Sequence, residues 1–573
     1  MKAKWKQTSI LFILIISLFI PLAPLHSLIQ AATAKSATTD DYYLTNSIKT
    51  AVKSILNEQT AEGTRIIAVV RLYNVGSRFT RVPDLEVRVR TEGDIEYILR
   101  PSFNNAKRIQ PKETVELSYM IVVDRVDTFS LTELSWVEVD EYVYPKLEKK
   151  VLSIPIPARE WRGENAVFTD PAWIKPWGEP FTIPELSSVL EFKTISLDEQ
   201  STPQGVMRIV KVLATNNGYT KKPIPDFRIA GKSDTNVYFG KRIEKEPLEL
   251  ESGEQRYLHY AIPAGNKIKM KSLFILIPEV FAVDEKTVIH YSIGQLNVIL
   301  PSDNNTIEAL DPLNNYEVNH PIPFDPLNEI IQAEVDISIV ALQMHQGVEG
   351  GFKVAIAKFK LHNRGASPIP LPKFQAQLMN SSSDKYSGTR QSTVVETLMP
   401  NINYVVNYSF ILPNTLTGEN LVMEILDGVT IAPYKITIAK FKTKVQVNET
   451  ENVFTFYPYN VNLNKWALAM NTGLGKDDHY KLMLDLAISI QDDVVVDQSY
   501  SKMKVEVIDA QGGVIGSKIL SFTGENRLMN GIQMIRINSE RFGESHSLRI
   551  YETIDTPFGQ AERLIKTMVE SEK

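Results

Sequence analysis

Three segments of this chain carry the same landmarks in the same order, and this internal repeat limits the fold more than any other feature. Each segment has an apolar run that ends at an Asn and a Gly, a proline seven residues after the glycine, and later a tyrosine within an alternating stretch. The landmarks are Asn74, Gly76, Pro83 and Tyr119; Asn217, Gly218, Pro225 and Tyr260; and Asn363, Gly365, Pro372 and Tyr408. Self-similarity at a domain-sized period indicates that one structural unit occurs three times.

Each repeat is predicted to be β-structure because apolar and polar residues alternate along it. In residues 115–123 every odd position is apolar, and in residues 404–412 every even position is apolar. A period of two places alternate side chains on one face of a strand, so one face is expected to be buried. Residues 47–56 would also suit a helix by composition, but their counterparts 188–197 and 335–342 favour a first strand.

The landmarks are interpreted as residues that maintain the fold. Gly76, Gly218 and Gly365 are predicted to occupy turns that need a positive φ, which glycine adopts without steric cost. Tyr119 and its two counterparts are predicted to pack in the core, with the hydroxyl bonded to a backbone partner. Asn-Gly pairs and prolines between the alternating runs supply the turns.

The last part of the chain lacks the landmarks but still alternates. Leu482, Leu484 and Leu486 form one alternating run, and residues 509–513 and 555–559 are predicted hairpin turns. We therefore predict an all-β chain, a tandem array of antiparallel β-sandwiches with a divergent fourth member. The predicted division is a signal peptide 1–34, repeats 41–157, 185–301 and 333–447, linkers 158–184 and 302–332, and a fourth domain 448–573.

The N-terminus has the order of a secretory signal. Lys2, Lys4 and Lys6 precede an apolar run at residues 10–20, and Ala32 and Ala34 offer small residues at a cleavage site. The alternative, an uncleaved membrane anchor, would need about 18–20 apolar residues, more than this run provides. Cleavage between residues 31 and 34 is favoured, so membrane contact is expected only before cleavage.

The punctuated repeat resembles bacterial immunoglobulin-like surface repeats of the cell-adhesion-related type. The resemblance rests on the Asn-x-Gly strand end, the following Pro-x-Phe, the proline turn and the alternating strand with its tyrosine, and it covers the three repeats. It implies an Ig-like sandwich and a surface or secreted location, with secreted modules of Gram-positive bacteria as the nearest in style. It transfers no functional residue.

Composition excludes several classes of protein. With no cysteine in 573 residues, the chain has no disulfide scaffold, thiolate zinc site or cysteine nucleophile. A sequence pI of about 5.9 argues against nucleic acid as a partner. Loss of the signal lysines would make the mature chain more acidic than its formal net charge of −6 indicates.

The sequence offers no catalytic constellation. Its eight histidines are scattered, and it has no zincin pair, nucleophile elbow, P-loop or dinucleotide glycine pattern. Two Ser-x-x-Lys matches, at residues 382–385 and 499–502, have no Lys-Thr-Gly partner. We therefore expect no enzyme, no catalytic residue and no resident cofactor.

Two linkers raise binding hypotheses. Trp161, Trp173 and Trp177 could stack on sugar rings, although stapling of neighbouring repeats is the favoured interpretation. The 303–315 linker carries Asp and Asn oxygens that could bind calcium, although a polar turn-forming linker is favoured. These oxygens belong to Asp303, Asn304, Asn305, Asp311, Asn314 and Asn315.

The sequence thus predicts a secreted or envelope-associated, non-catalytic protein for binding, adhesion or spacing at a bacterial cell envelope. The expected partners are a cell-wall polymer, a polysaccharide or another surface protein. The alternative is a carbohydrate-binding protein that uses the linker tryptophans or a sheet face, and an enzyme assembled from distant residues is a third class.

Overall fold

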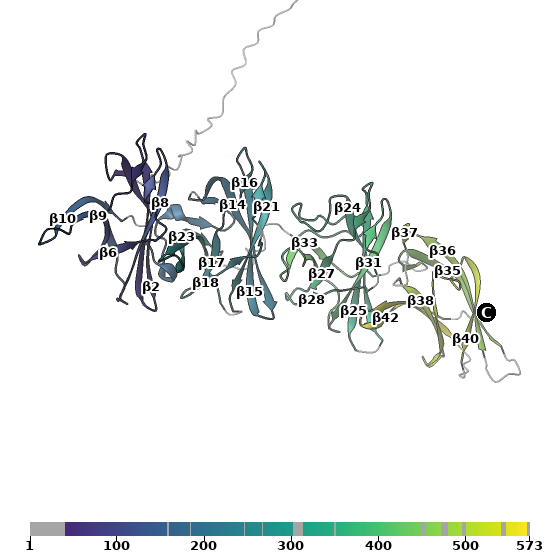
Figure 1. Cartoon of the computed structure of the whole chain (residues 1–573). Helices are drawn as coiled ribbons and strands as arrows, with labels where there is room; N and C mark the ends of the chain where they lie inside the picture. Colours follow the sequence, from purple (N-terminus) through teal and green to yellow (C-terminus); the bar gives the residue numbers. More distant parts are fainter. Residues whose placement is uncertain are drawn as a thin grey trace, which may run out of the picture. The chain divides into compact units, whose positions relative to one another are not determined.

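The computed structural model consists almost entirely of antiparallel β-strands, as the alternation predicts (Figure 1). It describes residues 41–569 apart from residues 157–159, 184, 246, 266–267, 302–312, 349–350, 393, 448–452, 472–478, 496–499 and 540–545. Within these ranges the helical segments are two short 3-10 turns, Gly163–Asn165 and Pro171–Trp173. No described helix has the length and apolar character to cross a membrane. The predicted signal peptide lies outside the described residues.

The chain divides into two compact units. Unit 1 contains the residues up to Gly163 together with Val280–Ile289, and unit 2 contains Glu164–Glu279 and the chain from His290 onward. The third repeat, the last segment and most of the second repeat therefore belong to one unit. The domain boundaries given above stay predictions.

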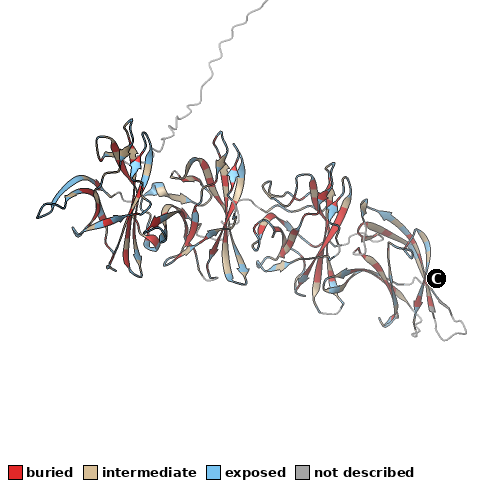
Figure 2. Cartoon of the chain, viewed as in Figure 1, coloured by how far each residue is buried: buried red, intermediate tan, exposed pale blue. Residues whose placement is uncertain are grey.

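The first repeat, in unit 1, folds around one apolar core. Its strands follow the order β1-β2-β3-β8-β6-β5-β9-β10. They are β1 (Tyr42–Tyr43), β2 (Ile48–Thr60), β3 (Gly63–Asn74), β8 (Thr114–Val123), β6 (Glu96–Pro101), β5 (Glu86–Thr91), β9 (Leu131–Asp140) and β10 (Leu147–Pro155). Inward residues such as Val70, Val89 and Trp136 share one buried cluster, and Figure 2 shows buried residues along these strands.

The second repeat packs two sheets face to face. One sheet has β13 (Pro180–Ile183), β14 (Ser187–Thr202), β15 (Gly205–Asn216), β21 (Gln255–Pro263) and β19 (Lys241–Arg242). The other has β12 (Ile174–Pro176), β23 (Val288–Ile299), β22 (Ser272–Ala282), β17 (Arg228–Lys232) and β18 (Val237–Phe239). Their inner faces meet in one cluster that contains Phe192, Phe227 and Tyr260.

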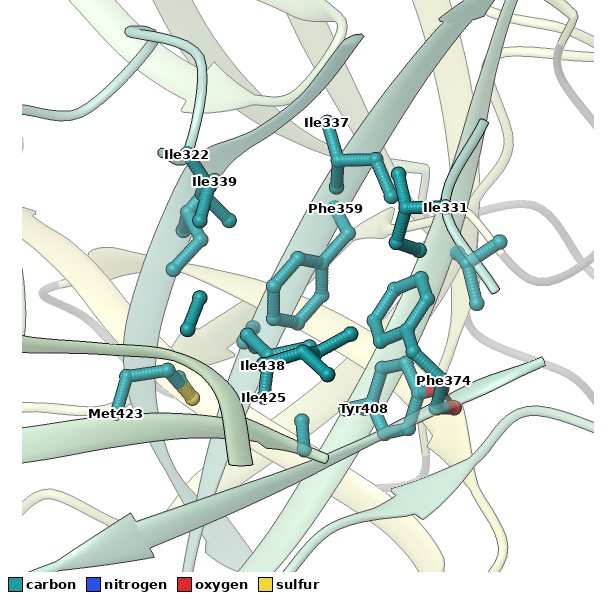
Figure 3. Packing of buried hydrophobic residues seen from close by; sticks show 14 of the residues in the cluster. Ile322, Ile331, Ile337, Ile339, Phe359, Phe374, Tyr408, Met423, Ile425 and Ile438 are labelled. Atoms are coloured by element: carbon teal, nitrogen blue, oxygen red, sulfur yellow. Dashed lines mark hydrogen bonds between the residues drawn. The ribbon is translucent and has the colours of Figure 1, made fainter. Parts of the chain in front are cut away.

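The third repeat has the same two layers. Four strands form part of a longer sheet: β24 (Val335–Gly347), β25 (Lys353–Asn363), β31 (Asn403–Leu412) and β29 (Thr389–Arg390). The facing sheet has β28 (Lys385–Ser387), β27 (Phe374–Met379), β32 (Leu421–Asp427) and β33 (Ile436–Thr443). Phe359, Phe374 and Tyr408 meet between the layers with ring centroids 5.3–5.4 Å apart (Figure 3).

The last segment is also a pair of sheets, as its alternation predicts. One has β34 (Val453–Phe456), β35 (Tyr459–Asn471), β36 (His479–Ile490) and β40 (Gly531–Asn538). The other contains β38 (Lys502–Ile508), β39 (Val514–Leu520), β41 (Ser547–Thr556) and β42 (Gly559–Val569). Leu482, Leu484 and Leu486 are buried, and both predicted hairpins form, β38–β39 and β41–β42.

The predicted linker 158–184 contains three short strands. Strand β11 (Glu160–Trp161) pairs with β2. Strand β12 pairs with β23 in one sheet of the second repeat, and β13 pairs with β14 in the other. Proline fixes φ near −65° and has no backbone N–H. An edge strand tolerates it, because an N–H on its outer side would have no neighbouring strand to bond.

A buried asparagine ends the second strand of each repeat and makes the same bonds three times. Its Oδ1 accepts the N–H of the glycine two residues later, and its Nδ2 donates to the carbonyl four residues later and to that of a small strand. The small strands are β7 (Arg108–Ile109), β20 (Glu249–Leu250) and β30 (Thr397–Leu398). The asparagines are Asn74, Asn216 and Asn363, each fully buried.

The landmark in the second repeat is thus Asn216, and the sequence assignment to Asn217 was wrong by one position. Asn217 is exposed, and its backbone N–H donates to the carbonyl of Val189. Sequence spacing alone does not show which of two adjacent asparagines is the buried one. Only the register of β15 shows which of them points inward.

The reason for the glycine landmarks also differs from the prediction. None of Gly76, Gly218 and Gly365 has a positive φ. A Cβ at each position would instead lie 3.0–3.1 Å from the Oδ1 atom of the bonded asparagine. Glycine is favoured there because the asparagine oxygen approaches the backbone closely.

The landmark tyrosines lie in the cores, as predicted. Tyr119, Tyr260 and Tyr408 are 8%, 0% and 1% exposed. Tyr408 donates its hydroxyl to the backbone carbonyl of Phe374, and among the described residues no such bond is found for Tyr119 or Tyr260. The predicted hydroxyl partner is therefore confirmed in the third repeat alone.

Candidate functional site

The third repeat and the last segment share one β-sheet. Strand β42 pairs with β24 at Gln346↔Glu562 and Gly347↔Ala561, which extends the order to β29-β31-β25-β24-β42-β41-β38-β39. A second contact is the parallel pairing of β37 (Val494–Val495) with β31. Backbone hydrogen bonds therefore cross the junction between the two segments.

A cluster of charged and polar side chains, which we call the junction cluster, lies at this junction. Its centre is Glu552 on β41, whose carboxylate accepts from His345 Nε2 at 3.2 Å and from Lys358 Nζ at 3.0 Å. Ser501 Oγ donates to the same carboxylate, and Arg563 on β42 contacts it at 2.8 Å. The side chains of Glu552 and His345 are 0% exposed and that of Lys358 is 2% exposed.

Three further bonds complete the cluster. The Gln343 amide, oriented with its nitrogen toward Glu552, donates to Oε2 at 3.0 Å and accepts from Arg563 at 3.1 Å. Lys358 also donates to Ser501 Oγ at 2.7 Å. The carboxylate is therefore surrounded by donors from both segments, which is the arrangement a buried charge needs.

The cluster sets the ionisation of its own members. Burial alone would raise the pKa of Glu552, but the charge of Lys358 and the hydrogen bond from His345 bring that pKa well below its usual value. Burial lowers the pKa of His345, and the bond to Glu552 offsets this only in part. At neutral pH the His345 imidazole is therefore uncharged and the Glu552 carboxylate is ionised.

Two groups of apolar residues also join the third repeat to the last segment. Val340 and Val405 of the third repeat pack against Tyr457 and Tyr500 of the last segment. A second group joins Val354, Ile356, Ile554 and Ala561. These contacts supply the hydrophobic attraction at the junction.

The stability of this junction is expected to fall as the pH is lowered. Both pKa values lie below their ordinary values of 6.5 and 4.5, so the unfolded chain takes up these protons first. The stabilisation is complete above about pH 6.5 and is lost progressively below it, first through His345 and then through Glu552. Thermal unfolding from about pH 7.5 to about pH 5.5 should show this decline, and His345→Gln should flatten it; equal slopes would contradict the assignment.

Sequence reasoning missed the junction cluster because its members are single polar residues that lie far apart in the chain. One signal was present: residues 354–357 and 339–342 are continuous apolar runs rather than alternating ones. Such runs are typical of strands that are buried on both faces. They could have indicated that another segment covers the outer face of the third repeat.

The structure separates the three linker tryptophans. Trp161 is 7% exposed and lies on β11 in unit 1. Trp173 and Trp177 are half-buried in unit 2, where they pack against the core of the second repeat. Trp161 therefore presents no open face to a sugar ring, and the glycan hypothesis now depends on the other two.

The calcium hypothesis falls mostly outside the described residues. Asp303, Asn304, Asn305 and Asp311 lie in the range 302–312. Asn314 is described, and its carbonyl accepts the N–H of Lys442. Among the described residues no group of three or more His, Asp or Glu side chains could hold a metal ion.

Comparison with known proteins adds little. No family model matches the chain, and no curated protein does either. The latent dimeric PorU of Porphyromonas gingivalis is 10% identical over 66% of this chain, with a TM-score of 0.13, and this chain covers only 34% of it. A DUF4785 family protein of Legionella pneumophila is 11% identical over 69% of this chain and 97% of its own, with a TM-score of 0.15. Likenesses of this size support no statement on function.

Proposed function

We propose that the chain is an extracellular, non-catalytic array of β-sandwiches that acts as a spacer at a bacterial cell envelope, where its end loops present binding surfaces. The N-terminal sequence supports secretion, and loops at the ends of rigid sandwiches are common binding positions. The partners proposed are a cell-wall polymer, a polysaccharide or another surface protein.

The junction cluster is the observation that carries this proposal. A spacer needs neighbouring modules fixed in one arrangement, and apolar contacts alone tolerate several. A shift of β42 along β24 would move Glu552 away from Lys358 and His345, which leaves buried charges unpaired. The cluster therefore selects one register between the third repeat and the last segment.

A distance measurement tests whether the junction is rigid. The chain has no cysteine, so spin labels can be placed at Ser387→Cys in the third repeat and Lys518→Cys in the last segment, both exposed positions. We expect a distance distribution as narrow as that of a control pair within the third repeat, Ser387→Cys with Thr417→Cys. A much broader distribution across the junction would refute the spacer.

A further inference from the structure

The first repeat carries a cluster of exposed cations at the end where β3 stops. Two segments, 75–84 and 105–112, meet there through the pairing of β4 (Thr80–Arg81) with β7. Together they hold five cations and one acid, Asp84. All five cations are exposed, and we call this cluster the basic end: Arg78, Arg81, Lys107, Arg108 and Lys112.

The basic end has no ion pair within the part of the chain that the structure describes. Other cations of the same repeat are neutralised, as Arg71 is by Glu116 and Arg88 by Glu86. Soluble surfaces usually mix both signs of charge, and a cluster of one sign attracts ligands of the opposite sign. Such a cluster is the more unusual here because the formal net charge of the chain is −6.

Two of these cations are placed opposite each other. Arg81 and Arg108 are direct partners in the β4–β7 ladder. Opposite residues of an antiparallel pair lie on the same face, and like charges there are destabilising. The guanidinium of Arg108 lies 5.8 Å from the ring centroid of Phe79, which is 62% exposed. Folding alone gives no reason to keep this repulsion, whereas anionic groups bound to both side chains would relieve it.

The corresponding end of the other two repeats lacks these cations. We align the repeats on the buried asparagine and on the residue whose N–H donates to the carbonyl of that asparagine. Lys221 of the second repeat is close to the aligned positions in the sequence, but it is paired with Glu249 and Glu251. The basic end is therefore a property of the first repeat and not a requirement of the shared fold. The aligned residues are Thr220, Pro223, Leu248, Glu249 and Gly253 in the second repeat, and Ser367, Pro370, Glu396, Thr397 and Asn401 in the third.

We propose that the basic end binds an extended anionic polymer through the phosphate or carboxylate groups along it. Five exposed side chains with unneutralised charges suit a ligand whose charges are spaced along a chain. Three of them are arginines, whose planar guanidinium matches both kinds of oxyanion. This inference rests on the proposed function and deepens it, because it names the ligand class of one end of the array.

An anionic polymer fits the basic end better than an anionic membrane does. Among the described residues, Phe79 is the one large apolar side chain that segments 75–84 and 105–112 expose. Binding within a membrane surface depends on buried apolar area as well as on charge, and one ring supplies little. The same ring offers a flat apolar face for a sugar unit of the polymer.

Titration of the full mature chain at low salt tests the proposal. The probes are inorganic polyphosphate for phosphate groups and polygalacturonate for carboxylate groups. Dextran serves as the uncharged polymer, and phosphatidylglycerol vesicles serve as the anionic membrane. We expect at least one anionic polymer to bind and dextran not to bind, and the polymer that binds more tightly identifies the charged group. The affinity should fall as salt is added, because bound polyanions release counterions.

A triple substitution locates the site. The variant Arg81→Gln, Lys107→Gln and Arg108→Gln should bind the polymer about tenfold or more weakly, and its dependence of log K on log salt should be less steep by about 2–3. Its melting temperature should not fall, because the facing charges of Arg81 and Arg108 are removed.

The matched control removes three charges from the β9–β10 hairpin of the same repeat. Lys146→Gln, Lys149→Gln and Lys150→Gln change side chains that are 57%, 75% and 39% exposed, and this variant should bind like the original chain. The proposal is overturned if neither anionic polymer binds, if both triple variants weaken binding alike, or if the vesicles bind while both polymers do not. Spin-label distances across the junction do not involve the basic end, so the spacer role and this ligand class can fail independently.

Discussion

Replacement of Glu552 by glutamine is expected to lower the free energy of unfolding of the third repeat and the last segment by about 3–5 kcal/mol. The substitution keeps the shape of the side chain but removes the charge that compensates Lys358 and Arg563. Lys358 would remain buried without its carboxylate, and the cost of an uncompensated buried charge is large. Calorimetry of the full chain should show the transition of these segments at a lower temperature.

Glu525→Gln is the matched control. Glu525 is exposed in a turn of the last segment and forms no described ion pair, so the same chemical change should alter stability by less than about 0.5 kcal/mol. Hydrogen exchange of peptides from β24 and β41 would show whether the loss is local to the junction. If the two variants melt alike, the junction cluster does not stabilise the contact.

Replacement of Asn216 by alanine is expected to destabilise the second repeat by about 3 kcal/mol. The variant loses the bond from the Gly218 N–H and those to the carbonyls of Thr220 and Leu250. The bonds to Gly218 and Leu250 are buried, so their backbone groups would be left without a partner. Each lost bond is worth about 1 kcal/mol, and unsatisfied groups add to the loss. Hydrogen exchange of β15 and β20 should increase.

Asn217→Ala makes the same chemical change one residue away and should cost less than about 0.5 kcal/mol, because the side chain is exposed. The pair therefore distinguishes the structural landmark from its neighbour. Equal losses would mean that both asparagines support the turn, and a larger loss at Asn217 would restore the assignment made from the sequence. The same substitution at Asn74 and Asn363 should act on the first and third repeats respectively.

The sequence predicted the strands well because a one-sided strand records its buried face in its own alternation. The first strands, the central strand with its tyrosine and both hairpins of the last segment follow from residues close together in the chain. Registers and outer faces were harder to predict. Residues 404–412 have an alternating inner face, yet Val405, Asn407 and Ser409 on the other face are also buried.

The candidate sites could not be predicted, because each joins residues that are far apart in the sequence. Lys358 and Glu552 look like solvent-facing residues of separate strands until β42 pairs with β24.

By itself, the sequence determined the all-β class, the threefold repeat and most strand positions, because period and turn chemistry are local properties. Only the tertiary structure decided which asparagine is buried, why the landmark glycines are glycines, and which polar residues form the junction cluster. Those features depend on the approach of atoms from distant strands, and a buried charge acquires its partners only through packing.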